Sequence, residues 1–338
     1  MLFGGVDAHR SYLTVAIVDE NGELVHEESR VPIEDGEPLL ASLDGYRPLE
    51  VVVEACSFWP WIADTLEPTE IGFHLAHARK LEAIAQAETK TDSVDARLLA
   101  RMLGAGLIPE VYPKPPDQRE IVRLVRHRDA LVEERTRLAN RVHSHLHQQG
   151  LELGTGRLLT EPGRQWLREE AWPWLSLEQR TLAKGHLELI DQLIRQIEQL
   201  DERIEKQAGE HPTACLLQTI PGFGSYRSLK LTGEVAPISR FLSPDHLVSY
   251  GGLAPTTRQS GAGDPRHGQI PKGANHAVRD VLHSAAGDHV RAAPDSAVSR
   301  FYRRKAEELG KHTARTAAAR KLCRVIYAML STGEVWRE

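Results

Sequence analysis

The chain has 338 residues, too long for one ordinary core, and its 41% hydrophobic and 26% charged residues exclude wholesale disorder. No run of about 18 apolar residues occurs, and Asp7, His9 and Arg10 interrupt any signal-peptide core, so we expect a soluble protein that is not exported. Three separated cysteines without a C-x-x-C pair predict reduced thiols in the cytoplasm.

The net charge of −5 averages over segments of very different character. Residues 1–112 hold 8 Lys and Arg against 20 Asp and Glu, a balance of −12, and residues 113–257 hold 19 of each. Residues 258–338 hold 15 against 8, a balance of +7. Such opposed ends are typical of an acidic, metal-using domain joined to a basic domain that binds anions.

The first domain, residues 1–112, alternates between strand and helix patterns. Helices are expected around 39–43 and over 58–66, 79–87 and 92–103, and strands at 2–6, 12–18, 24–31, 50–54 and 72–75. The resulting order β-β-β-α-β-α-β-α, with a mixed sheet, is that of the α/β ribonuclease H-like folds.

Four carboxylates fall at the ends of these elements. They are Asp7 after the first strand, Glu54 after the fourth, and Asp92 with Asp95 in the first turn of the last helix. If strands one and four are neighbours, these ends meet at one edge, where the carboxylates repel unless a cation neutralises them. Hard oxygen ligands suit Mg²⁺ or Mn²⁺, and such ions assist phosphoryl transfer. The alternative is ordinary helix capping and polar strand ends.

The middle region, residues 113–210, is predicted to be helical. One helix runs from 117 to about 149, and a second over 186–207 alternates Ile and Leu at spacings of three and four, which predicts a coiled coil. Its partner is either the first helix or a second protomer, so we expect a homo-oligomer. His143 and His147 share a helical face, but a solvated or phosphate-contacting face is favoured over a metal site there.

The last region, residues 211–338, is predicted to be mostly helical and begins with the motif I-P-G-F-G between two helices. This pattern matches a helix-hairpin-helix element, in which Gly222 and Gly224 let backbone amides approach a phosphate. A tight interhelical turn accounts for the same residues equally well.

A glycine-rich stretch of about 25 residues follows. Its glycines predict a loop whose backbone lies close to another molecule, and Arg258, Arg266 and Lys272 predict that this molecule is anionic. Arg279 in the next helix is a further candidate contact to nucleic acid. Ser260 lies within the loop; a loop serine is usually a turn former, and the acidic edge of the first domain is the evident activator of its hydroxyl.

Five motifs occur in a specific order along nearly the whole chain. They are G-V-D-A-H at 5–9, V-V-V-E-A at 51–55, T-K-T-D-S-V-D-A-R-L-L-A at 89–100, I-P-G-F-G at 220–224, and S-G-A-G followed by G-Q-I-P-K at 260–272. With these motifs the chain resembles the DEDD transposases of the insertion-sequence-110 family.

The resemblance implies a RuvC-like domain with the acidic set Asp7, Glu54, Asp92 and Asp95, and a C-terminal transposase domain with Ser260 as nucleophile. It implies a phosphoserine link to DNA followed by strand exchange, directed by a structured noncoding RNA that pairs with donor and target DNA. It also implies dimers of dimers, in which the acidic edge of one protomer meets the serine of another. We therefore expect the protein in the bacterial cytoplasm, at the nucleoid.

Three loop positions depart from the family pattern, which usually has glycine where Ala262 stands, Ser or Thr where Pro271 stands, and a glycine one place after Gly273. Two other functions fit the same residues. One is a RuvC-like, metal-dependent, structure-selective nuclease that uses water as nucleophile. The other is a non-catalytic scaffold that binds RNA or DNA.

Overall fold

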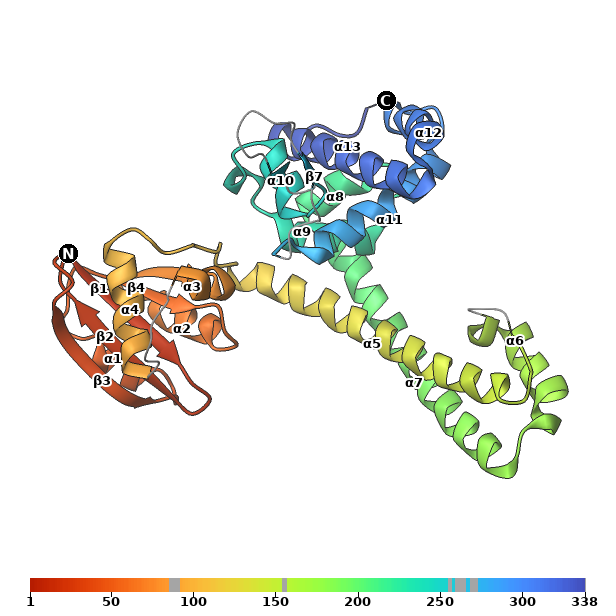
Figure 1. The fold of residues 1–338 in the computed structure, drawn as a ribbon, viewed down its shortest axis with the longest axis horizontal. Coiled ribbons are helices and arrows are strands. Elements are labelled where there is room, and N and C mark those ends of the chain that lie inside the picture. Colours follow the sequence, from red (N-terminus) through yellow and green to blue (C-terminus); the bar gives the residue numbers. More distant parts are fainter. Residues whose placement is uncertain (85–91, 154–156, 255–256, 259–265, 268–272, 338) are drawn as a thin grey trace. The chain divides into compact units, whose positions relative to one another are not determined.

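The chain folds as two units, Met1–Lys114 and Pro115–Glu338 (Figure 1). The structure, a computed structural model, describes residues 1–84, 92–153, 157–254, 257–258, 266–267 and 273–337. The predicted boundaries at residues 112 and 210, which divide the chain into three domains, stay predictions.

The first unit is built on a five-stranded mixed sheet with the order β3-β2-β1-β4-β5. Its strands are β1 Leu2–Ala8, β2 Tyr12–Val18, β3 Leu24–Pro32, β4 Leu49–Glu54 and β5 Gly72–Ala76. The first three are antiparallel neighbours, whereas β1 pairs with β4 and β4 with β5 in parallel. The mixed sheet is the one expected for a ribonuclease H-like domain, and strands one and four are neighbours, the arrangement on which the prediction of a shared acidic edge depends.

Helices pack against both faces of this sheet. They are α1 Glu37–Ser42, α2 Trp59–Leu66, α3 Ala78–Ile84 and α4 Asp92–Gly104. Because side chains alternate along β4, Val51 and Val53 pack with the apolar residues of α1 and α2, while Val52 packs with those of α3 and α4. The predicted end of the third helix at residue 87 lies outside the described residues.

The second unit is mostly helical. Its longer elements are α5 Pro116–His147, α6 Glu161–Trp166, α7 Leu177–Glu210, α8 Pro212–Gln218, α9 Ser225–Val235, α10 Pro244–Tyr250, α11 His276–Ala292, α12 Ala297–Leu309 and α13 Lys311–Thr332. Short helical turns and strands complete it: η1 Arg157–Leu159, η2 Leu167–Ala171, η3 Trp172–Trp174, η4 Ile238–Arg240, β6 Thr257–Arg258 and β7 Arg266–His267.

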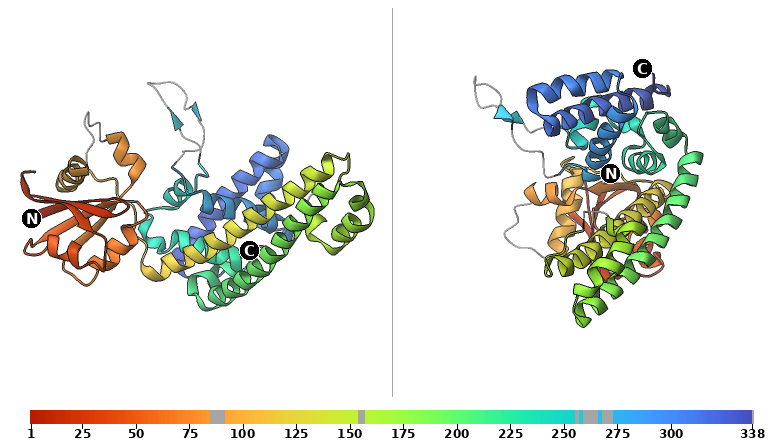
Figure 2. Two further views of the ribbon diagram at one scale, coloured as in Figure 1. Left: turned by 90° about the horizontal axis from the view of Figure 1, so that it is seen from below. Right: turned by 90° about the vertical axis from the view of Figure 1, so that its right-hand side faces the viewer.

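Helices α5 and α7 run side by side (Figure 2). The seam isoleucines Ile190, Ile197 and Ile204 of α7 are buried, so α5 of the same chain is a partner of this seam. Helix α7 starts earlier than predicted because Ser176 caps it: its hydroxyl accepts from Gln179 N, and the Gln179 side chain accepts from Ser176 N. Coiled-coil geometry and self-association stay predictions.

None of the described helices is both long enough and apolar enough to span a bilayer.

Candidate active site

The ends of two parallel strands bring the first pair of carboxylates to one edge of the sheet. The register of β1 and β4 pairs Val6 with Val53, and Asp7 and Glu54 are the residues that follow them. Parallel neighbours end at the same edge, so both carboxylates belong to it. The Asp7 side chain is 18% exposed.

The second pair is carried by α4, whose first turn contains Asp92 and Asp95. This helix packs directly on β1 at Gly5, where an added methyl group would meet Ala96 O at 2.0 Å and Ala100 N at 2.7 Å. Only a residue without a side chain permits this approach. The close contact brings the start of α4 to the edge that holds Asp7.

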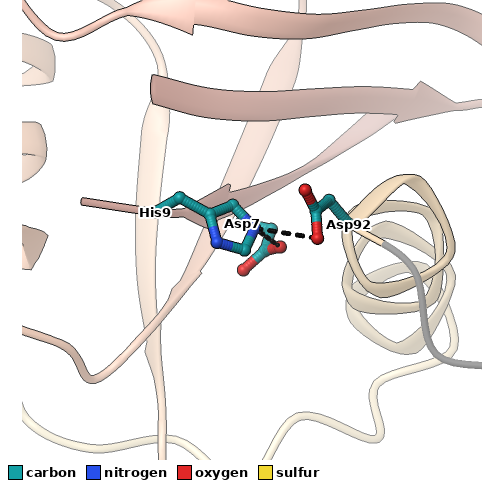
Figure 3. Close-up of side chains that lie close together, drawn as sticks. All are labelled: Asp7, His9 and Asp92. Atoms are coloured by element: carbon teal, nitrogen blue, oxygen red, sulfur yellow. Dashed lines mark hydrogen bonds and ion pairs between the residues drawn. The ribbon is translucent and has the colours of Figure 1, made fainter. Parts of the chain in front are cut away.

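At this edge Asp7, His9 and Asp92 meet (Figure 3). Nε2 of His9 lies 2.7 Å from Oδ2 of Asp7 and 3.2 Å from Oδ1 of Asp92, between the two carboxylates. The Tyr12 hydroxyl donates to the other oxygen of Asp92 at 2.8 Å. Asp92 is therefore held from both sides by residues of the β1–β2 hairpin.

Neither His9 nor Tyr12 was predicted from the sequence to belong to the site. One signal was available for His9, because it stands two residues after Asp7 and residues at that spacing share a face of an extended chain. The contact of Tyr12 with Asp92 joins residues 80 positions apart, so no local pattern reveals it.

The charge of Asp95 also acts on Asp7 at this edge. Burial raises the pKa of Asp7, His9 opposes this shift, and the charges of Asp95 and Asp92 raise the pKa further. The pKa of Tyr12 is also raised, first by its hydrogen bond to Asp92. Burial is therefore the main cost of a charged Asp7, and the neighbouring carboxylates add to that cost.

The donor atoms suit a divalent cation. One ligand atom each from Asp7, His9 and Asp92 lies within 4.8 Å of the others, the one such group found in the described part of the chain. Carboxylate oxygens are ligands for Mg²⁺ and Mn²⁺, and an imidazole nitrogen among them is better matched to a transition metal than to Mg²⁺. The donor set thus fits a divalent ion.

The candidate residues of the glycine-rich loop are described only in part. Ser260 and Lys272 lie outside the described residues. Arg258 and Arg266 are register partners in the backbone of the short antiparallel pair β6 and β7. Arg279 lies in α11, with Nε 3.8 Å from Oδ1 of Asp280.

One buried carboxylate ties the described ends of this loop together. Glu234 of α9, whose side chain is 4% exposed, accepts from Nδ2 of Asn275 at 2.9 Å. The same Nδ2 lies 2.9 Å from the Tyr250 hydroxyl, and Asn275 N donates to Tyr250 O at 2.7 Å. Tyr250 ends α10 before the loop and Asn275 caps α11 after it.

The I-P-G-F-G turn joins α8 to α9 and rests against α11. Gly222 has φ +86°, and a methyl group there would meet His289 N at 2.8 Å. Nδ1 of His289 donates to Pro221 O at 2.9 Å. Packing thus accounts for Gly222, while Gly224 has open space beside its Cα and precedes α9. The helix-hairpin-helix interpretation and the phosphate contacts of both glycines stay predictions.

Comparison with known proteins relates both units to transposases. Residues 4–150 match the family model of the DEDD transposases of IS110 type, and residues 214–303 match that of the IS116/IS110/IS902 transposases. The chain is 26% identical to the transposase of insertion sequence IS1111A from Coxiella burnetii, over 98% of this chain and 90% of that protein. It is 28% identical to the pilin gene-inverting protein of Moraxella bovis, over 83% and 80% of the two chains.

A third relative, the transposase of IS1328 from Yersinia enterocolitica, is 26% identical over 73% of each chain. The two family models cover both the acidic edge and the loop region, and the similarity to the IS1111A transposase extends over 98% of the chain. The chain therefore belongs to the IS110 family of insertion-sequence transposases, a family of enzymes.

Proposed function

We propose that this transposase is an RNA-guided DNA recombinase that cuts and rejoins DNA through a serine–phosphodiester intermediate, with a RuvC-like carboxylate site that holds a divalent ion. The convergence of Asp7, His9 and Asp92 within 4.8 Å supports the metal site. Membership of the IS110 family supports the recombination chemistry.

Asp7 and Asp92 would hold the ion, with Glu54 and Asp95 completing the acidic set. A divalent ion at this edge, Mg²⁺ or Mn²⁺, supplies Lewis-acid polarisation of the scissile phosphate. Tyr12 keeps one oxygen of Asp92 oriented by its hydrogen bond of 2.8 Å. His9 lies between the two carboxylates and opposes their repulsion.

Ser260 would be the nucleophile. Its oxygen forms a bond to phosphorus, the bond from phosphorus to the 3′ oxygen breaks, and a 3′-hydroxyl leaves. Because the number of phosphodiester bonds is unchanged, a 3′-hydroxyl of a partner strand can attack the serine ester and restore the DNA. The network of Glu234, Asn275 and Tyr250 joins the described residues on either side of the loop that carries Ser260.

The partners follow from the resemblance. A structured noncoding RNA of the element pairs with donor and target DNA, and the active form is a homo-oligomer, from dimer to tetramer. In this assembly the acidic site of one protomer serves the serine of another.

The test is the covalent protein–DNA adduct formed when the full chain, with its co-purified RNA, meets donor and target DNA. Mg²⁺ or Mn²⁺ should give an adduct with wild type and with Ser249→Ala, an exposed-serine control, but none with Ser260→Ala. Asp92→Asn should lower the rate about a thousandfold, since the Lewis-acid contribution is several kcal/mol.

Other outcomes separate the two alternatives. Metal-dependent cleavage that survives Ser260→Ala would show that water is the nucleophile and that the protein is a nuclease. Binding of nucleic acid without strand breakage by any form would leave only a scaffold. Sequencing of the RNA that co-purifies with the full chain tests the guide, and a random collection of cellular RNA would contradict it.

A further inference from the structure

Helices α12 and α13 pack side by side and leave two adjoining hollows between them, of about 700 and 370 Å³. Phe301 and Lys321 line both hollows. Arg320 and Arg324 line the larger one, and Arg300 and Arg304 line the smaller. These six residues define the α12–α13 groove. Helix α13 lies outside the region 214–303 that the family model matches.

The groove concentrates positive charge. Arg324 pairs with Asp245 at 2.6 Å, and the charges of Arg320 and Arg304 act on Asp245 and Glu308, but in the described residues no carboxylate forms an ion pair with Arg300, Arg304, Arg320 or Lys321. Arg300 and Lys321 donate to the backbone carbonyls of Asp295 and Ala297. Burial and the charges of Arg300 and Arg304 lower the pKa of Lys321. Nε of Arg320 is buried with no hydrogen-bond acceptor among the described atoms. Cations held together in this way attract an anionic ligand.

An aromatic ring lies among these cations. Nζ of Lys321 lies 5.1 Å and Cζ of Arg304 5.5 Å from the ring centre of Phe301. A groove that combines cations for the backbone with an aromatic side chain for stacking is the common way to bind an unpaired strand. In a duplex the faces of the bases are covered by their neighbours, so Phe301 would have nothing to stack on.

The other residues that line the two hollows are only alanine and valine. The groove therefore offers no neutral hydrogen-bonding side chain with which to read base edges or a 2′-hydroxyl. Binding there is expected to be independent of sequence. The family acts on DNA, whose backbone meets every requirement of the groove.

We propose that the α12–α13 groove binds single-stranded DNA, with the cations on its phosphates and Phe301 stacked on a base. A single strand arises when the guide RNA displaces one strand of its DNA target. That use rests on the proposed function, whereas binding itself requires neither the metal site nor the serine.

The test measures the affinity of the full chain for nucleic acid in EDTA, with Ser260→Ala present in every protein. The result then depends neither on catalysis nor on which residue is the nucleophile. The probes are fluorescent oligo-dT of about 20 nucleotides, a duplex of equal length and oligo-U. Arg304→Gln with Lys321→Gln removes two groove charges. Arg303→Gln with Lys311→Gln removes one Arg from α12 and one Lys from α13 outside the hollows.

The groove variant should bind oligo-dT at least about tenfold more weakly. The slope of its affinity against salt concentration should fall by the amount expected for the loss of nearly two phosphate contacts. The control variant should bind oligo-dT with an affinity within about twofold of wild type. Loss of a groove contact would change the affinity by more than that. Phe301→Leu should weaken oligo-dT binding roughly tenfold, leave its salt dependence unchanged and leave duplex binding unaffected.

Equal losses of oligo-dT affinity in the groove and control variants would overturn the proposal. So would a Phe301→Leu variant that weakens binding to the duplex as much as binding to oligo-dT. If the groove variant bound oligo-U more weakly but oligo-dT unchanged, the proposal would be overturned, and the ligand of the groove would be RNA. Should the double variant not fold by circular dichroism, Arg304→Glu, at an exposed position, takes its place. Unchanged oligo-dT binding by that variant also overturns the proposal.

Discussion

One nitrogen, Nε2 of His9, lies within 3.2 Å of oxygens from both Asp7 and Asp92. This imidazole edge lies between the two carboxylates and opposes their repulsion. The pKa of Asp7 nevertheless stays raised, mainly because burial disfavours its charged form, and the charges of Asp95 and Asp92 add to the shift. A charged Asp7 therefore lowers the stability of the fold, and a cation at this edge would offset that loss.

Asp7→Asn tests that balance. The folded chain raises the pKa of Asp7 above its value in the unfolded chain, so Asp7 costs stability at pH values above that unfolded pKa. Asp7→Asn should therefore raise the free energy of unfolding at pH 7 in EDTA, and the gain should disappear as the pH falls through the folded pKa to below the unfolded one. Urea denaturation at several pH values measures it, and a destabilised variant at pH 7 would contradict it.

Addition of Mn²⁺ should reverse the order of stability, so that wild type becomes more stable than Asp7→Asn. At a concentration one hundred times the Kd, an ion that binds only the folded state adds about 2.7 kcal/mol to wild type. Asp7→Asn lacks a ligand and should gain little. Equal gains in both proteins would show that the ion binds elsewhere.

Asn275 allows a second test at the residue scale. Asn275→Ala removes the cap of α11 and a hydrogen bond to the buried Glu234 carboxylate, and should cost about 1–3 kcal/mol. Asn275→Asp keeps a capping oxygen but places a second carboxylate beside Glu234, so part of its loss should return at acidic pH. Denaturation at pH 7 and pH 5 distinguishes the two, and identical pH profiles would argue against repulsion.

Among the elements, the contact between β1 and α4 positions the site. Gly5→Ala should cost at least about 1–3 kcal/mol and should weaken Mn²⁺ binding, because the added methyl group pushes α4, which carries Asp92, from the sheet. Gly4→Ala is the control, because its methyl group meets mainly a side-chain atom of Val51, at 3.1 Å, which can shift. Calorimetric metal titration and denaturation measure both effects, and equal losses would contradict the special role of Gly5.

The elements of the first unit were predictable because their signals are local. Alternating or wholly apolar runs such as Val51–Val53 indicated the strands, whereas the pairing of strands one and four was assumed and is given by the structure. The capping box of Ser176 and Gln179 was equally local and would have located the start of α7. By contrast, the contacts of His9, Tyr12 and Gly222 depend on how α4 and α11 pack, which no nearby residue specifies.

At the scale of the whole molecule, the first unit has its own apolar core on each face of its sheet. Residues 1–114 produced alone should therefore unfold cooperatively in urea and gain stability from Mn²⁺ as the full chain does. Circular dichroism with and without Mn²⁺ measures this. A fragment that lacks a cooperative transition would show that the second unit is needed for folding.

Asp7, Glu54 and Asp92 come from three separate stretches of the chain, and Asp92 arrives last, on α4. During translation, the ribosome must release all three stretches before the acidic edge can exist. A truncated polypeptide that ends before residue 92 lacks one of these carboxylates and, under the proposed chemistry, is inert.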